Sequence, residues 1–362
     1  MAHRQEQEPA RSDVVEVAPK ILRMELPIRM PGLGHVNMYA LLDADGAALI
    51  DPGLPGPFAW RAIQDRLSKA GLRTRDVHTI LITHSHPDHF GGAARFQREV
   101  GARVIAHHGF SFEPVQAVRP EVSADDVAAQ AAHETEHEAV HETGRPSKGA
   151  DVPWAGRTPW GGERPRPALH RRLQLRMMRL IGRRWLPHIT QPVSHGDALR
   201  LAGRDMFVFH TPGHTADHFC LHDPDSGTLL AGDHVLPTIT PHISGLSASR
   251  DPLASFFYSL DRVAEIAGIG TVLPAHGHPF TDLRARTEAI KRHHHERLAR
   301  VKEISRDFGR PASVREFSHQ LFRPRSWGAM AESETYAHLE HLRLLGEAER
   351  RAERGALLYR AD

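Results

Sequence analysis

The sequence contains little cysteine, few aromatic residues and no long apolar segment. Its single cysteine, Cys220, excludes an intramolecular disulfide, which is typical of proteins from a reducing compartment. No apolar run approaches the ~20 residues that a membrane-spanning helix needs. The first 13 residues are polar and lack the apolar stretch of a secretory signal. We therefore expect a cytoplasmic protein without a transmembrane segment.

The chain also lacks an excess of charge of either sign. It has 46 Lys and Arg residues against 44 Asp and Glu residues, a net charge of +2. This balance argues against a uniformly basic nucleic-acid-binding protein. What the sequence has in abundance is histidine, with 28 residues of 362. Because histidine is the commonest metal ligand and the side chain that titrates near neutral pH, its positions are the first guide to function.

The order of apolar segments predicts an α/β protein with an insertion and a tail. Residues 1–13 are predicted to be a disordered tail. Strand and helix patterns alternate over 14–282, but they are interrupted at 110–192. The last part, 283–362, begins with a long charged helix and is predicted to be a small helical domain.

The insertion carries two helical patterns of different character. Residues 121–142 are acidic and rich in Ala and His, whereas 168–185 form an amphipathic helix with six arginines on its polar face. We interpret this basic helix as a lid that packs its apolar face on the sandwich. Gating of an apolar substrate pocket, or contact with a membrane surface or nucleic acid, are the alternatives.

Five short motifs lie at or just beyond the ends of predicted strands. They are Asp51-Pro-Gly53, His84-Ser-His-Pro-Asp-His89, His210-Thr-Pro-Gly-His214, Gly232-Asp233-His234 and Ala275-His276-Gly277. Loops at the ends of strands converge on one edge of an α/β sheet, so these side chains are expected to meet there.

The spacing within these motifs predicts two neighbouring metal sites. The alternation of His84 and His86 lets both imidazoles point to one side of an extended loop. His214 would complete this first site. The second site would be formed by Asp88, His89 and His276, and the carboxylate of Asp233 would bridge the two.

Imidazole and carboxylate without thiolate is the ligand set of a borderline cation. We expect two Zn²⁺ ions, with iron or manganese as alternatives. Three protein ligands for each ion and a shared carboxylate leave positions open for water, which is typical of a catalytic site rather than a structural one.

Together these motifs resemble the metallo-β-lactamase superfamily over 14–282, excluding the insertion. THSHPDH matches its signature, HTPGHT its third-motif histidine, AGDHVL its bridging aspartate and PAHGH its last histidine. The resemblance implies an αββα sandwich with a dinuclear metal site at one edge, held by the ligands given above. It also implies that Asp51 supports the metal loop and that His210 is structural. The tail resembles that of a hydroxyacylglutathione-hydrolase-like branch with a C-terminal winged-helix-like extension.

The leading hypothesis is a dinuclear hydrolase of a small-molecule ester, thioester or lactone. A metal-bridging hydroxide would attack the carbonyl and Asp88 would shuttle the proton. Alternatives are a lactamase-like endoribonuclease or phosphodiesterase, an enzyme similar to mononuclear iron persulfide dioxygenases, and a regulator that binds DNA through its tail. We interpret the tail as a homodimer contact or a closure of the active site. The three consecutive histidines at 293–295 are expected to lie at the surface.

Overall fold

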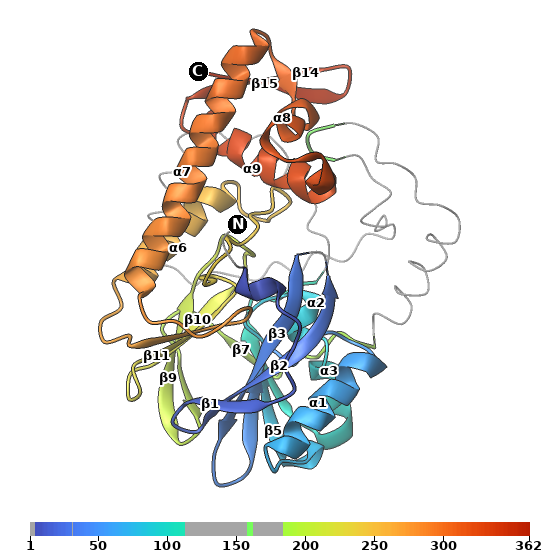
Figure 1. Cartoon of the computed structure of the whole chain (residues 1–362), viewed down its shortest axis with the longest axis vertical. Coiled ribbons are helices and arrows are strands. Elements are labelled where there is room, and N and C mark those ends of the chain that lie inside the picture. The colour runs from blue at the N-terminus through green and yellow to red at the C-terminus, as the bar shows by residue number, and fades with distance from the viewer. Residues whose placement is uncertain (1–3, 31, 113–157, 162–183) are drawn as a thin grey trace.

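The computed structural model describes residues 4–30, 32–112, 158–161 and 184–362 (Figure 1). The two helices predicted at 121–142 and 168–185 lie outside these residues, apart from the last two positions of the second. None of the described helices is both long and apolar enough to cross a membrane.

The first sheet is built from the N-terminal half of the chain. In order across the sheet it contains β1 (Val14–Ala18), β2 (Ile21–Met30), β3 (Leu33–Leu42), β4 (Ala47–Ile50), β5 (Val77–Leu81), β6 (Arg103–His107) and β7 (Gln191–Val193). The strands from β1 to β4 pair antiparallel, and those from β4 to β7 pair parallel. The amide of Asp43 donates to the carbonyl of Gly46 and closes the turn between β3 and β4.

The second sheet follows in the chain and packs against the first. Across the sheet its order is β12 (Thr271–Pro274), β11 (Thr228–Gly232), β10 (Phe219–Asp223), β9 (Arg204–His210) and β8 (Ala198–Leu201), with only β11 and β12 parallel. Side chains from both sheets, such as Ile50 and Leu81 from the first and Phe219 and Leu230 from the second, form one buried cluster. Its burial removes apolar surface from water and holds the sheets face to face.

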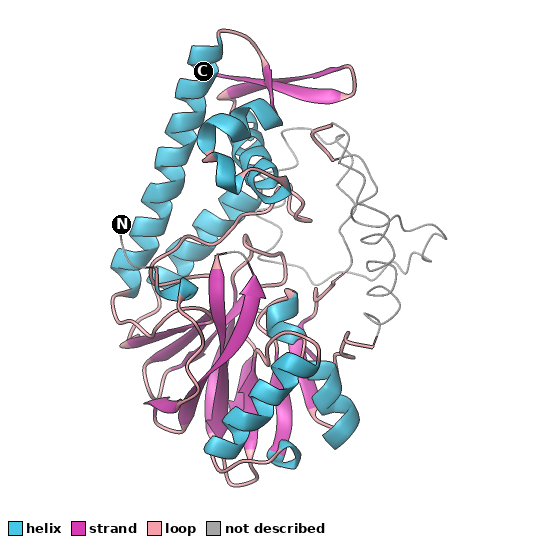
Figure 2. Cartoon of the chain, turned by 45° about the vertical axis from the view of Figure 1, so that its right-hand side comes forward, coloured by secondary structure: helices cyan, strands magenta, loops and turns pink. Residues whose placement is uncertain are grey.

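Helices cover the outer face of each sheet (Figure 2). The first sheet is covered by α1 (Pro57–Lys69) and α3 (Ala93–Val100), whose Ile63, Leu67 and Phe96 pack in a second cluster with strand residues. The short α2 (Pro87–Phe90) follows β5, and α6 (Pro252–Ala264) and α7 (Leu283–Phe308) pack on the second sheet. The predicted αββα sandwich is therefore confirmed.

The C-terminal region holds three helices and a small sheet. After α7 come β13 (Ala312–Ser313), α8 (Val314–Leu321), α9 (Ala329–Leu344), β14 (Ala348–Glu353) and β15 (Ala356–Ala361), and the strand order is β13-β15-β14. The predicted helical character is confirmed, whereas the winged-helix assignment stays a prediction. One cluster of buried side chains joins Val272 of β12, Ile290 of α7 and Phe317 of α8. The C-terminal region thus shares its core with the outer face of the second sheet.

The prediction of a histidine surface at 293–295 is wrong for its middle residue. His294 is fully buried on α7, where α9 packs across it, and its Nδ1 lies 3.1 Å from Nε2 of His338. The sequence of α7 alone could not show that a later helix covers this side.

The prediction of a disordered tail at 1–13 is also wrong from residue 4 onward. A 3₁₀ helix forms at Gln5–Gln7, and the carboxylate of Glu6 is fully buried. It accepts hydrogen bonds from the amides of Thr238 (2.7 Å) and Ile239 (3.0 Å). We refer to residues 4–12 as the N-terminal segment, which is fixed because a buried carboxylate needs these donors.

Candidate metal centre

The five motifs meet at one edge of the sandwich, as the strand pattern predicts. Asp51 follows β4 and the loop 84–89 follows β5, both in the first sheet. His214 lies beyond the end of β9, Asp233 directly follows β11, and His276 comes two residues after β12. Both sheets therefore contribute side chains to the same site.

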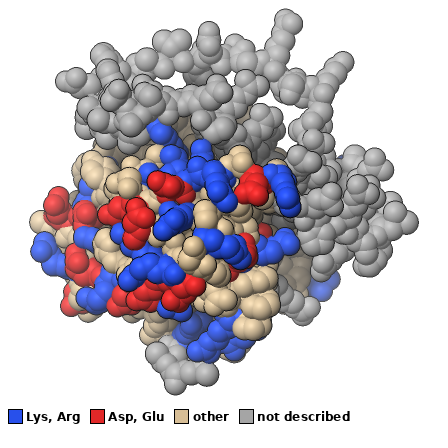
Figure 3. Space-filling view, turned by 90° about the horizontal axis from the view of Figure 1, so that it is seen from above, with Lys and Arg blue, Asp and Glu red and all other residues tan. Residues whose placement is uncertain are grey.

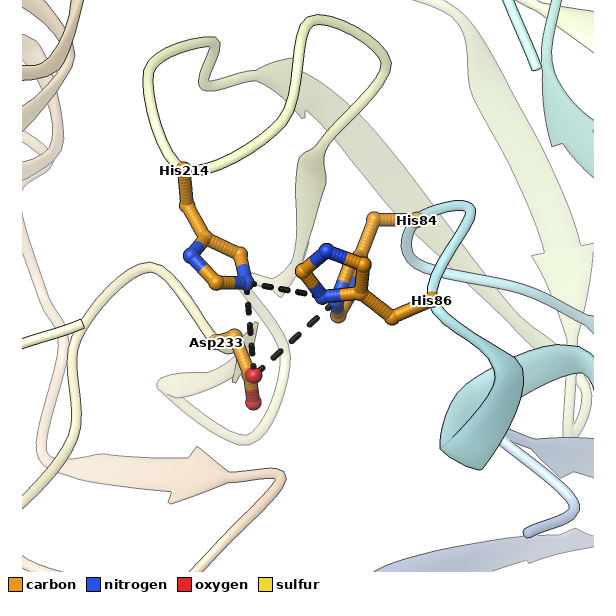
Figure 4. A group of neighbouring side chains, drawn as sticks. All are labelled: His84, His86, His214 and Asp233. Carbon is orange, nitrogen blue, oxygen red and sulfur yellow. Dashed lines mark hydrogen bonds and ion pairs between the residues drawn. The ribbon is translucent and has the colours of Figure 1, made fainter. Parts of the chain in front are cut away.

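Three imidazoles and one carboxylate form the first group (Figure 4). Nδ1 of His86 lies 3.0 Å from Nε2 of His84 and 3.1 Å from Nε2 of His214. Oδ2 of Asp233 lies 3.5 Å from Nε2 of His214 and 3.9 Å from Nε2 of His84. These four ligand atoms all lie within 4.8 Å of one another, a spacing that could hold one metal ion.

A second group lies beside the first. Oδ2 of Asp88 is 3.6 Å from Nε2 of His89 and 3.5 Å from Nε2 of His276. Asp233 extends to this group too, with Oδ1 at 3.3 Å from His276 and Oδ2 at 3.7 Å from His89. Its carboxylate thus lies between the two groups, where the sequence predicts a bridging ligand.

Hydrogen bonds on the far side of three rings turn the other nitrogen toward the centre. Nδ1 of His89 donates to Asp51 (2.9 Å), and Nδ1 of His276 donates to the carbonyl of His35 (2.6 Å). In the same way, Nδ1 of His214 donates to the carbonyl of His242 (2.8 Å). Fixing one ring nitrogen as a donor leaves Nε2 to bind a metal, which is the usual arrangement of metal-ligating histidines.

The polar atoms that face the gap fit a cation. Nε2 of His89, Nε2 of His276 and Oδ1 of Asp233 are buried without a hydrogen-bond partner among the described residues. Buried polar atoms are rarely left in this state, because each costs about 1–3 kcal/mol. Five imidazoles and two carboxylates are a donor set suited to zinc, iron or manganese.

The electrostatics of the two groups differ. Burial lowers the pKa of His84 and His86 well below the ordinary value, and the neighbouring imidazoles lower it further. Burial also lowers the pKa of His89, but the carboxylates of Asp88, Asp233 and Asp51 outweigh it and raise this pKa to about 10. The second group therefore attracts positive charge, which a bound cation would supply.

Asp51 holds the loop 84–89, which carries four of the proposed ligands. Its side chain is buried, and its Oδ1 accepts from the amide of Thr83 (2.9 Å). Its Oδ2 accepts from the hydroxyl of Thr83 (2.7 Å) as well as from His89. Because Thr83 precedes the loop 84–89, this carboxylate fixes both the start of the loop and one of its rings.

Two further histidines, His218 and His210, belong to neither group of ligand atoms. Nε2 of His218 accepts from the amide of Asp233 (3.0 Å), which orients the backbone there. His210 donates to the carbonyl of Ala216 (2.8 Å) and stacks on His107, which is consistent with the expected structural role.

Sequence reasoning missed three groups that hold ligands in place. The carbonyl of His35 orients His276, and Nδ1 of His35 in turn donates to the carbonyl of Glu8 in the N-terminal segment (2.8 Å). The carbonyl of His242 orients His214. No sequence signal identifies backbone acceptors of this kind, because any residue could supply them.

Comparison with known proteins points to one family. The model of the metallo-beta-lactamase superfamily matches residues 31–299. The probable metallo-hydrolase YqjP of Bacillus subtilis is 25% identical over 331 residues, which are 88% of this chain and 91% of that protein. The human acyl-coenzyme A thioesterase MBLAC2 is 27% identical over 260 residues, covering 68% of this chain and 74% of the relative.

A solved structure shows the same architecture. A metallo-beta-lactamase family protein from Thermus thermophilus aligns with a TM-score of 0.70 at 29% identity, over 96% of this chain and all of the other. Shorter matches include the hydroxyacylglutathione hydrolase of Maricaulis maris, 33% identical over 101 residues, which are 28% of this chain and 37% of that protein.

Proposed function

Because the chain belongs to the metallo-beta-lactamase superfamily and is a hydrolase of that group, we propose that it binds two divalent metal ions and cleaves an ester, thioester or lactone. The observation that carries this proposal is the convergence of seven ligand atoms in two adjoining groups that share the carboxylate of Asp233. A single structural ion would need no second group and no shared carboxylate.

In this proposal each side chain has a defined task. His84, His86 and His214 hold the first ion, and the second group holds the other. Two such ions supply Lewis acidity toward a carbonyl oxygen and acidify bound water. Asp88 lies at the second group with its Oδ2 directed at two ring nitrogens, so it is placed to take up the proton that the attacking water releases.

The relatives support an acyl substrate. One relative is named an acyl-coenzyme A thioesterase and another a hydroxyacylglutathione hydrolase, and both names describe thioester cleavage. We extend this substrate class to the present chain, with a small molecule as the substrate and the cytoplasm as the location.

The face of the molecule seen from above gives no support to a nucleic-acid partner. The view from above shows Lys and Arg interspersed with Asp and Glu (Figure 3). Ion pairs such as Arg351–Glu353 and Lys302–Glu347 contribute to this mixture. A DNA-binding face would need a basic patch. We therefore propose that the C-terminal region serves the active site or a homodimer contact.

Metal analysis combined with a substrate panel tests the proposal. The purified protein is assayed for bound metals and then for hydrolysis of acyl thioesters, esters, lactones, bis-nitrophenyl phosphate and single-stranded RNA. Oxygen consumption with a persulfide is measured in parallel. We expect two zinc ions in each chain and turnover of an acyl substrate. A single iron with oxygen consumption, or cleavage restricted to RNA or the phosphodiester, would refute the proposal.

A further inference from the structure

The loop after β11 joins the metal centre to the C-terminal region. Helix α9 lies beyond the sheet edge that carries the centre (Figure 1). Ser333 of α9 accepts from the amide of Gly245 through its carbonyl (3.2 Å) and its hydroxyl (3.1 Å). A Cβ at Gly245 would come within 2.7 Å of that carbonyl, so the close approach requires glycine. The loop is thus firmly attached to α9.

The next residue of α9 contacts His242 of the same loop, whose backbone is hydrogen-bonded to a proposed metal ligand. Oε2 of Glu334 lies 3.1 Å from Nδ1 of His242. The carbonyl of His242 accepts from Nδ1 of His214, a side chain of the first metal group. A continuous set of hydrogen bonds therefore connects α9 with a proposed metal ligand.

Glu334 is itself held in place. Nη1 of Arg297 on α7 donates to its Oε1 (2.9 Å), and the guanidinium of Arg297 also stacks over the ring of Phe322. Burial raises the pKa of Glu334, but the hydrogen bond from His242 and the charge of Arg297 outweigh it and hold this pKa well below the ordinary value. The carboxylate is therefore charged and fixes Nδ1 of His242 as a donor.

The ring of His242 lies beside the metal centre and remains accessible. Its own backbone carbonyl lies 2.8 Å from Nδ1 of His214, which places this residue directly beside the first group. Its side chain is 23% exposed, whereas that of His84 is fully buried. With Nδ1 directed at Glu334, Nε2 is the nitrogen that can contact a bound molecule.

We propose that the C-terminal region forms part of the active site. Glu334 is a positioning residue that fixes His242, whose carbonyl orients His214 and whose ring hydrogen-bonds a polar group of the acyl substrate. This inference rests on the proposed metal-dependent hydrolase. It assigns to the C-terminal region a role at the active site, although none of the proposed metal ligands lies in that region.

Three variants and a matched control test the two parts separately. Glu334→Ala removes the contact to His242, whereas Glu334→Gln keeps an acceptor without the charge. His242→Gln keeps the backbone carbonyl and a donor for Glu334 but removes the ring. The control is Glu340→Gln, which removes the charge of a buried carboxylate of α9 that binds Arg343, Arg350 and Tyr359 instead of the loop. Zn²⁺ affinity by competition with a chelator, kcat, KM and thermal midpoint are measured for each.

We expect Glu334→Ala to weaken Zn²⁺ binding by about 10-fold, the lower end of the effect of losing an outer partner of a metal-ligating histidine, because the carbonyl of His242 stays present but is held less firmly. Glu334→Gln should retain most of this affinity. His242→Gln should bind Zn²⁺ like the wild type and raise KM by about 5–10-fold, as the loss of one substrate hydrogen bond predicts. Glu340→Gln should lower only the thermal midpoint.

Two results would overturn the inference. Zn²⁺ affinity of Glu334→Ala equal to that of Glu340→Gln would exclude the positioning role, and unchanged KM in His242→Gln would exclude the substrate contact. If Glu334→Ala does not fold, a fourth variant, His242→Ala, removes the ring that Glu334 holds. A Zn²⁺ affinity of His242→Ala equal to that of Glu340→Gln would then exclude the positioning role. If the wild type hydrolyses no acyl substrate, the proposed function fails while the Zn²⁺ affinities still decide the role of Glu334.

Discussion

Replacing Asp51 by Asn should damage the second metal group while leaving its ligands unchanged. The three donors that meet this carboxylate are the amide and hydroxyl of Thr83 and Nδ1 of His89. An amide that keeps the bond to the Thr83 amide places its NH₂ where Oδ2 lay. This NH₂ would then face Nδ1–H of His89, so the ring must turn to the tautomer that carries its proton on Nε2. That nitrogen could no longer bind a metal.

The size of the effect follows from the bonds that change. One outer partner of a metal-ligating histidine is typically worth about 10–100-fold in metal affinity or activity. The two hydrogen bonds from Thr83 would also lose their charged acceptor. This loss should lower the free energy of unfolding by about 1–3 kcal/mol. The backbone adds no strain, because Asp51 has a φ of 53°, a conformation that Asn adopts readily.

Zn²⁺ affinity by chelator competition and urea unfolding measure the two effects. The matched control is Asp223→Asn. Asp223 is the last residue of β10, at the end of that strand that lies away from the metal centre. There the buried carboxylate binds Ser226 and Arg204 and contacts no proposed ligand. We expect both variants to lose stability but only Asp51→Asn to lose one Zn²⁺ site. Equal Zn²⁺ affinity in the two variants would refute the reasoning from tautomers.

Four further predictions follow from the same structure. Asp88→Asn should lower kcat far more than it changes KM, and equal activity with intact metal content would exclude the proton-shuttle role. Removal of metal by a chelator should lower the thermal midpoint, because ligand binding to the folded state contributes about 4 kcal/mol when the free metal is 1,000 times Kd; an unchanged midpoint would contradict metal binding. Glu6→Gln should cost about 1–3 kcal/mol of unfolding free energy in urea, since a buried carboxylate loses charge-assisted bonds; equal stability would show that the N-terminal segment is not needed. Burial lowers the pKa of His294 to about 2 and of His338 to about 4, below the ordinary value near 6.5, so the unfolded chain binds more protons in acid and stability is lost as pH falls from about 6.5. Each ring contributes up to about 1.4 kcal/mol per pH unit, so unfolding in urea between about pH 7 and about pH 5 should be less pH-dependent in His294→Phe; an equal slope would contradict this.

The sequence predicted the sandwich and the convergence of the site because both depend on local patterns. A buried strand such as β5 followed directly by the loop 84–89 identifies a strand end, and strand ends of α/β sheets meet at one edge. The carboxylate of Asp51 was likewise assigned to support the loop, and its bonds to Thr83 and His89 agree. In each case the signal lies within a few residues of the functional side chain.

The errors concern contacts between distant parts of the chain. The N-terminal segment has the composition of a disordered tail, yet Glu6 binds amides 232 and 233 residues away. His294 belongs to a helix whose histidines point in several directions, and only the packing of α9 across it shows which one is buried. Composition and periodicity carry no information about such partners, since neither pattern changes when a remote segment covers the surface.

These distant contacts lead to the proposed metal ligands themselves. His276 is oriented by the carbonyl of His35, and that ring is held by the backbone of the N-terminal segment. His214 is oriented by the carbonyl of His242, and that ring is held by Glu334 near the other end of the chain. One ligand of each metal group thus depends, through a single intermediate residue, on a segment outside the two sheets. Since the ligands project from loops, which lack the hydrogen-bond ladder of a sheet, these two supports restrict the motion of the rings. The two ends of the chain therefore act on different metal groups, and damage to one end should weaken one group before the other.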